Sequence, residues 1–208
     1  MTTTKTPITP DPEHFLIREQ DGLRLITPKS SAAFDDQIWN PDNLHFRSRV
    51  ETLDGETVSQ GFKKFMNLGQ GPDGVRVATA DVVTACVHGD AIATLKIDGS
   101  LIVRSVYQGR IILRTRGSFG YEHQDNAFEI EKCVQRYPRL LDPSYRPEIS
   151  LLLEWVSPTN VIIFKYDEAD LILVGGIRRD DYQYLQLDEL HTIAADLGIE
   201  GDFRGGID

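Results

Sequence analysis

A lysine next to a carboxylate and a tight turn is the feature of the sequence that most directly suggests chemistry: Lys96-Ile97-Asp98-Gly99-Ser100. A lysine amine can act as a covalent nucleophile, and in an extended chain Lys96 and Asp98 point to the same side. Gly99 has no side chain, so the backbone can approach a ligand closely at this turn. By pattern alone, an ordinary hairpin with an exposed lysine is favoured, because Asp-Gly turns and surface lysines are common.

A second candidate is Glu154, which lies inside the apolar run Leu-Leu-Leu-Glu-Trp-Val of residues 151–156. Burying a bare carboxylate costs several kcal/mol, so a buried Glu154 needs a cation, hydrogen-bond donors or a metal-bound water. The alternative is a glutamate that faces solvent on the polar side of an edge strand. The pattern leaves these two interpretations open.

Two groups of cations have the character of phosphate-binding segments. Arg114-Thr115-Arg116-Gly117-Ser118 places two arginines on one face of a predicted strand, a geometry suited to phosphate oxygens. A solvated charged face is the alternative for this group. The second group, Lys63-Lys64-Phe65-Met66-Asn67, interleaves cations with an aromatic ring, as a nucleotide pocket does, but it is a weak signal by itself.

Alternating apolar residues and turn signals predict the elements that must position these side chains. Helical spacing predicts helices at residues 125–137 and 188–197, the second with Gly198 as its C-cap. The predicted strands are residues 91–96, 100–107, 110–115, 151–156, 161–166 and 171–177. We therefore expect one α+β domain over residues 13–208, with mostly antiparallel sheets and flanking helices, after a flexible Thr/Pro-rich leader at residues 1–12.

Composition and charge exclude several classes of protein. The chain has 208 residues, 22 Lys+Arg and 32 Asp+Glu, and its net charge of −10 argues against coating nucleic acid by bulk electrostatics. Residues 96–118 are locally basic, so any site for a polyanion is expected there; the cations are Lys96, Arg104, Arg110, Arg114 and Arg116. The longest apolar run, residues 171–177, is far below the roughly 20 residues of a membrane helix. We expect a cytoplasmic protein with no membrane partner.

Taken together and in order, these segments resemble the RNA ligase family typified by the tRNA-repairing ligase 1 of T-even bacteriophages, within the covalent nucleotidyltransferases. Lys96-Ile97-Asp98-Gly99-Ser100 resembles the nucleotidyl-accepting motif Lys-x-Asp-Gly-Ser. Residues 64–68 resemble the upstream segment Lys-Phe-Phe-Asn-Leu, and residues 114–118 resemble Lys-Ser-Lys-Gly-Ser. Residues 153–160 resemble Phe-Glu-Phe-Val-Ala-Pro-Thr-Asn, and residues 171–178 also fit. Arg47-Ser48 takes the place of a family Arg-Gly.

The resemblance implies the α+β fold of the ATP-grasp-like ligase adenylation domain and a reaction in three steps. Lys96 attacks the α-phosphate of ATP, releases pyrophosphate and becomes a lysyl-AMP. The AMP then passes to an RNA 5′-phosphate, and an RNA 3′-hydroxyl finally displaces it. The implied cofactors are ATP and Mg²⁺, and the implied partner is RNA with 5′-phosphate and 3′-hydroxyl ends.

The resemblance also implies roles for individual residues. Lys96 is the catalytic nucleophile, and it binds the nucleotide together with Gly99. Glu154 serves the nucleotide and the metal ion, while Asp98 orients Lys96 or holds a metal-bound water. The remaining phosphate-contacting positions are Arg47, Lys64 and Arg116.

Two family motifs have no counterpart in this sequence: a later strand containing Glu-Gly and a Lys-x-Lys pair after it. Glu200-Gly201 is followed by an acidic, glycine-rich segment, and the last lysine is Lys165. The sequence is therefore expected to be the amino-terminal part of a longer ligase, or a protein with the ligase fold and altered activity. The second case includes a nucleotide- or RNA-binding protein without turnover. A ligase of another nucleic acid, or a capping-like nucleotidyltransferase, is a third alternative.

Overall fold

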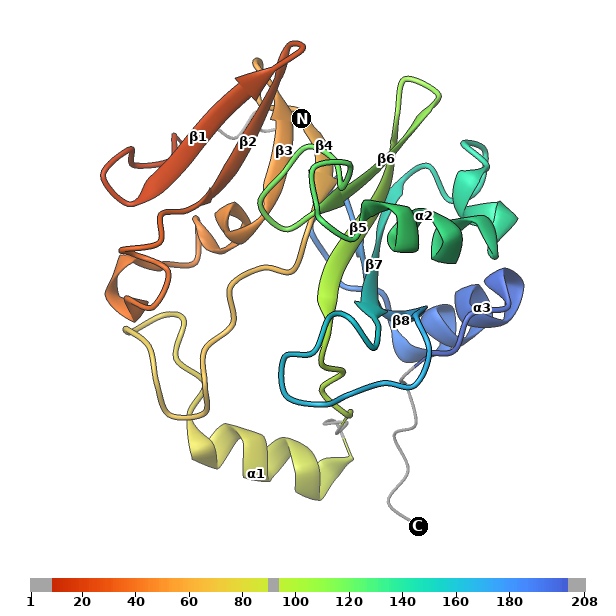
Figure 1. Ribbon diagram of the computed structural model, residues 1–208. Helices are drawn as coiled ribbons and strands as arrows, with labels where there is room; N and C mark the ends of the chain where they lie inside the picture. Colours follow the sequence, from red (N-terminus) through yellow and green to blue (C-terminus); the bar gives the residue numbers. More distant parts are fainter. Residues whose placement is uncertain (1–8, 90–93, 202–208) are drawn as a thin grey trace, which may run out of the picture. The chain divides into compact units, whose positions relative to one another are not determined.

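The computed structural model of the protein describes residues 9–89 and 94–201 (Figure 1). The chain divides into two compact units. The first comprises Met1–Thr57 and Phe62–Ala91, and the second comprises Val58–Gly61 and Ile92–Asp208. The predicted extent of one domain over residues 13–208 stays a prediction, and the first eight residues of the predicted leader lie outside the described residues.

Short strands and an aromatic core build the first unit. One four-stranded sheet has the strand order β1-β2-β3-β4, and its strands are β1 (Phe15–Gln20), β2 (Leu23–Pro28), β3 (Arg49–Thr52) and β4 (Thr57–Gln60). Strands β1 to β3 belong to the first unit, whereas all of β4 after Thr57 belongs to the second. Asp21 and Gly22 join β1 to β2 with φ values of 51° and 76°, as a two-residue hairpin turn with a right-handed strand twist requires. The Phe15 ring meets the rings of Trp39 and Phe46 edge to face, at centroid distances of 5.4 and 5.5 Å. The helical segments are η1 (Asp36–Ile38), η2 (Leu44–Arg47) and α1 (Thr79–His88).

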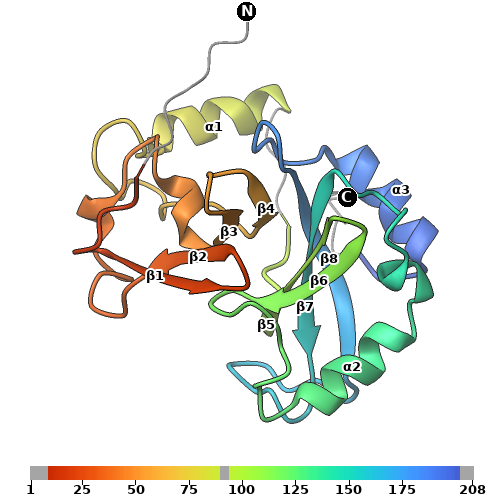
Figure 2. The same ribbon diagram turned by 90° about the horizontal axis from the view of Figure 1, so that it is seen from above.

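The second unit is a four-stranded antiparallel sheet with helices. Its strand order is β6-β5-β7-β8, and the strands are β5 (Ser100–Tyr107), β6 (Arg110–Thr115), β7 (Ile149–Val156) and β8 (Asp170–Arg178). Helices α2 (Ala127–Gln135) and α3 (Leu187–Leu197) cover the same face of this sheet (Figure 2). The short helix η3 (Pro138–Leu141) follows α2.

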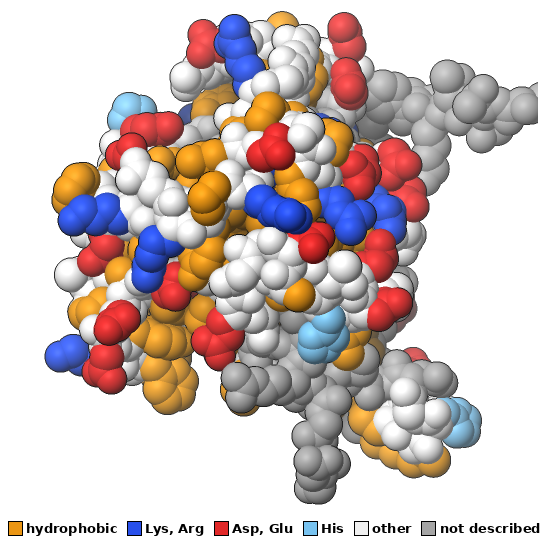
Figure 3. All heavy atoms as spheres, turned by 90° about the vertical axis from the view of Figure 1, so that its right-hand side faces the viewer, with side chains coloured by type: hydrophobic (Ala, Val, Ile, Leu, Met, Phe, Trp, Pro, Cys, Tyr) orange, Lys and Arg blue, Asp and Glu red, His pale blue; other side chains and the backbone are white. Residues whose placement is uncertain are grey.

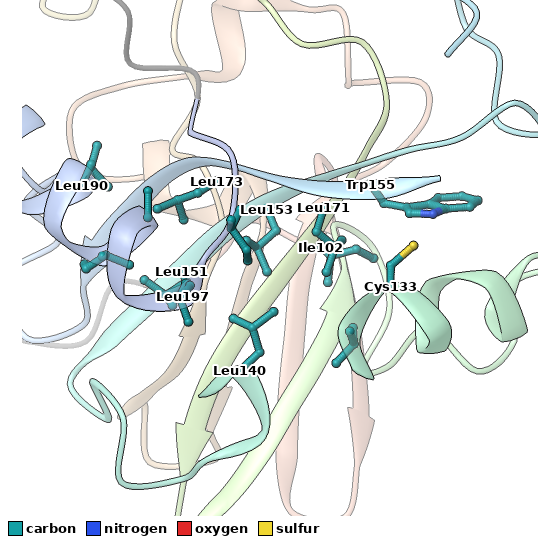
Figure 4. Packing of buried hydrophobic residues seen from close by; sticks show 14 of the residues in the cluster. Ile102, Cys133, Leu140, Leu151, Leu153, Trp155, Leu171, Leu173, Leu190 and Leu197 are labelled. Carbon is teal, nitrogen blue, oxygen red and sulfur yellow. The ribbon is translucent and has the colours of Figure 1, made fainter. Parts of the chain in front are cut away.

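Alternation along β7 decides which side chains face the helices. Leu151, Leu153 and Trp155 pack into the core with residues of β8, α2 and α3, such as Leu173, Cys133 and Leu197 (Figure 4). Successive residues of a strand point to opposite faces of a sheet. Glu154 therefore lies on the face of the sheet that α2 and α3 do not cover.

The structure confirms the α+β class with antiparallel sheets and most of the predicted elements of the second unit. The strands predicted at residues 100–107 and 110–115 are β5 and β6, and those at 151–156 and 171–177 lie within β7 and β8. Both predicted helices form, and Gly198 caps α3 with a φ of 67°. No helix or strand of the first unit was predicted from the sequence.

Two predicted strands are corrected. Residues 161–166 form no strand, because the N–H groups of Ile163 and Phe164 donate to the Asp98 carboxylate instead of to a neighbouring strand. The side chains of residues 161–164 are all more than half exposed, unlike those of a strand in a sheet core. Of the strand predicted at residues 91–96, residues 91–93 lie outside the described part, and residues 94–96 have no regular structure. Among the described residues, no helix is long and apolar enough to cross a membrane.

Candidate functional site

Lys96 extends its amine into solvent in front of a buried carboxylate. Its Nζ lies 3.7 Å from Asp98 Oδ1, and the Lys96 side chain is 85% exposed whereas that of Asp98 is 4% exposed. Both residues lie in the second unit, in the irregular segment that leads into β5. The amine is therefore accessible to a substrate, while the carboxylate is fixed behind it.

Asp98 is held as an anion by backbone donors. Its Oδ2 accepts hydrogen bonds from Ile163 N at 2.6 Å and from Phe164 N at 3.0 Å. The N–H groups of Phe164 and Ile163, together with the Lys96 charge, outweigh the effect of burial and hold the pKa of the Asp98 carboxyl below its ordinary value. The buried Asp98 carboxylate thus has two backbone donors and a cation.

Glu154 meets the same turn from strand β7. Its Oε1 accepts a hydrogen bond from Gly99 N at 3.1 Å. Burial raises the pKa of Glu154 from 4.5 to about 7, although the Gly99 N–H and the Lys96 charge act in the opposite direction. Of the two interpretations left open for Glu154, the structure selects the partly buried carboxylate with a donor. The Lys96 turn and Glu154 are thus brought together from positions more than fifty residues apart.

The raised pKa of Glu154 predicts a pH-dependent stability. The pKa of Glu154 is higher in the folded state than in the unfolded state. The protonated Glu154 therefore contributes stability that is fully present below about pH 4.5 and is lost as the pH rises through about 7. Glu154→Gln imitates the neutral carboxyl. We expect its unfolding free energy, measured relative to the wild type, to increase by about 2 kcal/mol as the pH rises from 5 to 8. Urea unfolding in buffer with a chelator measures this difference, and two parallel pH profiles would contradict it.

Gly99 sits too close to β7 to carry a side chain. A methyl group at this position would lie 2.3 Å from the Trp155 carbonyl oxygen and 3.1 Å from Glu154 Cγ. We expect Gly99→Ala to lower the free energy of unfolding by about 2 kcal/mol, because backbone atoms must move apart. Gly117→Ala is the matched control, since nothing lies within 4 Å of its added methyl group. Chemical denaturation of both variants measures the effect, and equal stabilities would show that the turn is looser than described.

Two residues that the sequence analysis did not single out also hold the lysine segment. Asn160 Nδ2 donates to Ser100 Oγ at 3.0 Å, so the loop after β7 is tied to the start of β5. The Tyr166 hydroxyl accepts a hydrogen bond from Asp98 N at 3.2 Å. Asn160 was visible in the sequence only as part of the Pro-Thr-Asn segment, and Tyr166 only as the end of a predicted strand. Neither position carries a local signal for this contact.

A cavity of about 410 Å³ lies next to the lysine, between its two sequence neighbours and the edge of the sheet. Leu95, Ile97, Val156 and Ile172 give it apolar walls. The other lining residues are Tyr166, Asp167, Glu168, Asp170, Glu200 and Gly201, most of which are acidic. Its volume lies within the range of small-molecule sites, roughly 300–1,000 Å³.

The predicted pair of phosphate-binding arginines is corrected, because Arg114 is fully buried. Its guanidinium donates to Ser59 Oγ at 2.8 Å, to the Ser59 carbonyl at 3.1 Å and to the Thr115 carbonyl at 3.0 Å. Burial lowers the pKa of Arg114 to about 9. Arg116 is exposed in the turn after β6. Of the two arginines, only Arg116 can reach a phosphate.

Fewer cations of the basic segment, residues 96–118, are exposed than the sequence indicated. Arg104, like Arg114, has no exposed surface. On the face shown in Figure 3, Lys and Arg side chains are interspersed with Asp and Glu side chains. The local positive charge of residues 96–118 therefore does not translate into a uniform basic surface.

Arg47 and Lys64 lie in the first unit, and each has an identified contact there. Lys64 Nζ lies 2.7 Å from Asp36 Oδ1. The Arg47 guanidinium stacks on the Phe65 ring at 4.7 Å from its centroid. The grouping of these two residues with Lys96 in one phosphate-binding site stays a prediction.

Comparisons with known proteins match most of the chain. A family model described as "RNA ligase" matches residues 44–204. The "Putative RNA ligase" of Thermovibrio ammonificans is 27% identical over 150 residues, which cover 70% of this chain and 36% of that protein. The chain thus spans about a third of the length of this curated relative.

Solved structures show the same fold at low sequence identity. An archaeal ATP-dependent RNA ligase superposes with a TM-score of 0.55 at 13% identity, over 90% of this chain and 46% of that one. A "Putative ATP-dependent DNA ligase from Aquifex aeolicus" gives a TM-score of 0.55 at 11% identity, over 91% of this chain and 46% of that one. The chain therefore shares the fold of these two ligase structures.

Proposed function

The chain belongs to the RNA ligase family, and on this premise we propose that its second unit carries the adenylation site of an ATP-dependent RNA ligase, with Lys96 as nucleophile. The observation that carries the proposal is the convergence of Lys96, Asp98, Gly99 and Glu154 at one turn. Lys96 Nζ is exposed, and two carboxylates from separate segments stand behind it.

In the proposed first step, the neutral amine of Lys96 attacks the α-phosphorus of ATP. A P–N bond forms, the bond to the pyrophosphate oxygen breaks, and the amine proton leaves to solvent. An RNA 5′-phosphate oxygen then attacks the adenylate phosphorus and releases Lys96, and an RNA 3′-hydroxyl displaces AMP. Arg47, Lys64 and Arg116 are proposed to bind phosphate oxygens, where cations stabilise the charge that develops in phosphoryl transfer.

The carboxylates also fit a hydrated Mg²⁺ ion. Magnesium prefers oxygen ligands and keeps several of its waters. Asp98 Oδ2 and Glu154 Oε1 accept backbone N–H groups, whereas the contact identified for Asp98 Oδ1 is the one with Lys96 Nζ. Asp98 and Glu154 are thus proposed to hold the ion through water. When bound, Mg²⁺ would offset the negative charge of the ATP phosphates.

The cavity next to Lys96 is proposed to receive the base of the nucleotide. Its apolar walls, Leu95, Ile97, Val156 and Ile172, suit the faces of an aromatic ring. Its carboxylates can accept the N–H groups of an amino-substituted base, and they repel phosphate. The base would therefore enter the cavity while the phosphates stay outside it, towards the exposed amine.

Intact mass spectrometry after incubation with ATP and Mg²⁺ tests the proposal without an RNA substrate. A mass gain of one AMP, which a 5′-phosphorylated RNA then discharges, is the expected result. Parallel incubations with GTP, and with DNA ends in place of RNA, separate an RNA ligase from a capping-like enzyme and from a DNA ligase. Saturable ATP binding without a covalent adduct would overturn the proposed reaction.

A nucleotide- or RNA-binding protein without turnover is the second candidate function. It is supported by the apolar-walled cavity next to Lys96, which can receive a base whether or not Lys96 reacts. This candidate predicts that ATP protects the chain against thermal unfolding while its mass stays unchanged.

A further inference from the structure

The lysine segment and the loop after β7 hold each other through hydrogen bonds in both directions. The Asp98 side chain accepts N–H groups of the loop, from Ile163 at 2.6 Å and Phe164 at 3.0 Å. In return, the backbone N–H of Asp98 donates to the side-chain hydroxyl of Tyr166 at 3.2 Å. We call these three bonds the Asp98–Tyr166 latch.

Besides the latch, the Gly99 N–H bond to Glu154 and the Asn160 bond to Ser100 hold the ends of the two segments. Residues 94–98 and 161–166 have no regular secondary structure. Ile163 and Phe164 are 74% and 63% exposed, so the packing of their side chains contributes little to the position of the loop. Tyr166 differs from them, because it is half-buried and lines the cavity together with Leu95 and Ile97. Tyr166 thus both lines the cavity next to the lysine segment and accepts a hydrogen bond from that segment.

From this geometry we propose that Tyr166 is a positioning residue for Lys96. The Lys96 side chain is 85% exposed and makes one identified contact, to Asp98 at 3.7 Å. The place of its amine therefore depends on the backbone of residues 96–98, which the Tyr166 hydroxyl fixes at Asp98 N. The inference rests on the proposed role of Lys96 as nucleophile, since positioning matters for catalysis only if Lys96 reacts.

Tyr166→Phe tests the inference with little change in packing, because it keeps the ring in the cavity wall and removes only the oxygen. We expect the rate constant for lysyl-AMP formation at saturating ATP to fall about tenfold, with the half-saturating ATP concentration changed less than about twofold. Tyr107→Phe is the matched control. Its hydroxyl accepts a hydrogen bond from Gln108 at the exposed end of the β5–β6 hairpin, and we expect its rate to equal that of the wild type.

Hydrogen exchange supplies a second measurement that does not depend on activity. In Tyr166→Phe, the amides of Asp98, Ile163 and Phe164 should all exchange about five to ten times faster, because the loss of one bond loosens both segments. Asp98→Ala should expose the same three amides, while Tyr107→Phe should expose none of them.

The outcomes separate this inference from the proposed function. Unchanged exchange at Ile163 and Phe164 in Tyr166→Phe would overturn the latch, and an unchanged rate constant with a lowered melting temperature would show a purely structural role. If the wild type forms no adduct, the proposed function fails. The exchange of the three amides then decides by itself whether Tyr166 positions the lysine segment.

Discussion

Lys96→Ala is expected to form no AMP adduct after incubation with ATP and Mg²⁺, a loss of at least about a thousandfold in the rate of self-adenylation. The covalent bond requires a nucleophile at this place, and the Lys96 amine is the exposed group in front of Asp98. Intact mass spectrometry measures the adduct, and peptide mapping of the wild type should place it on Lys96.

Two further variants separate the nucleophile from its charge. Lys96→Arg keeps a cation near Asp98 but stays protonated, so we expect it to form no adduct either. Lys132→Ala is the matched control, since this lysine lies on α2 and its identified contact is with the Phe128 ring. An adduct on Lys96→Ala with the stoichiometry of the wild type would refute the assignment of the nucleophile. An equal loss in Lys132→Ala would point to a general effect of lost charge.

Arg104→Leu is expected to lower the free energy of unfolding by about 3 kcal/mol or more, the largest effect on stability that we predict. Arg104 has no exposed surface, and its guanidinium satisfies carbonyl groups of the η3 region. It donates to Leu140 O at 3.1 Å, Asp142 O at 2.6 Å and Tyr145 O at 2.7 Å. A leucine would fill part of the space and leave these buried acceptors unpaired, at about 1–3 kcal/mol each before relaxation.

Urea unfolding of Arg104→Leu measures this loss, and Arg110→Leu is its control on the same sheet. Arg110 is exposed at the start of β6, so its replacement is expected to change the unfolding free energy by less than about 0.5 kcal/mol. Burial lowers the pKa of Arg104 to about 10, which leaves the guanidinium charged at neutral pH. Equal stability of the two variants would show that the carbonyl groups of residues 140–145 do not need Arg104 as their hydrogen-bond donor.

Strand β4, which the sequence patterns do not predict, shows where patterns of polarity fail. Strand β4 (Thr57–Gln60) is polar in sequence, yet Ser59 and Gln60 are fully buried. Ser59 Oγ accepts hydrogen bonds from Arg114 Nε at 2.8 Å and from Ser105 Oγ at 2.9 Å. In the sequence, Ser105 lies 46 positions and Arg114 lies 55 positions from Ser59. A polar residue is buried when distant groups satisfy its hydrogen bonds, and no local window of sequence contains that information.

The same reason explains why the sequence overstated the exposed positive charge of residues 96–118. The sequence correctly located a concentration of cations at residues 96–118, but a count of charges does not reveal which of them are solvated. Strand alternation in β5 and β6 turns Arg104 and Arg114 inward, where carbonyl and hydroxyl oxygens replace water. Lys96 and Arg116, which lie outside the strands, are exposed.

The amino-acid sequence by itself determined the local parts of the candidate site. The turn at Lys96-Ile97-Asp98-Gly99-Ser100, the strands β5 to β8 and their alternation depend on neighbouring residues, so periodicity and turn chemistry predict them. Only the tertiary structure decided that Glu154 accepts the Gly99 N–H, that Asp98 accepts the N–H groups of Ile163 and Phe164, and that Tyr166 holds Asp98. These bonds join residues 55 to 68 positions apart, and strand register and loop packing, which a local pattern does not encode, bring them together.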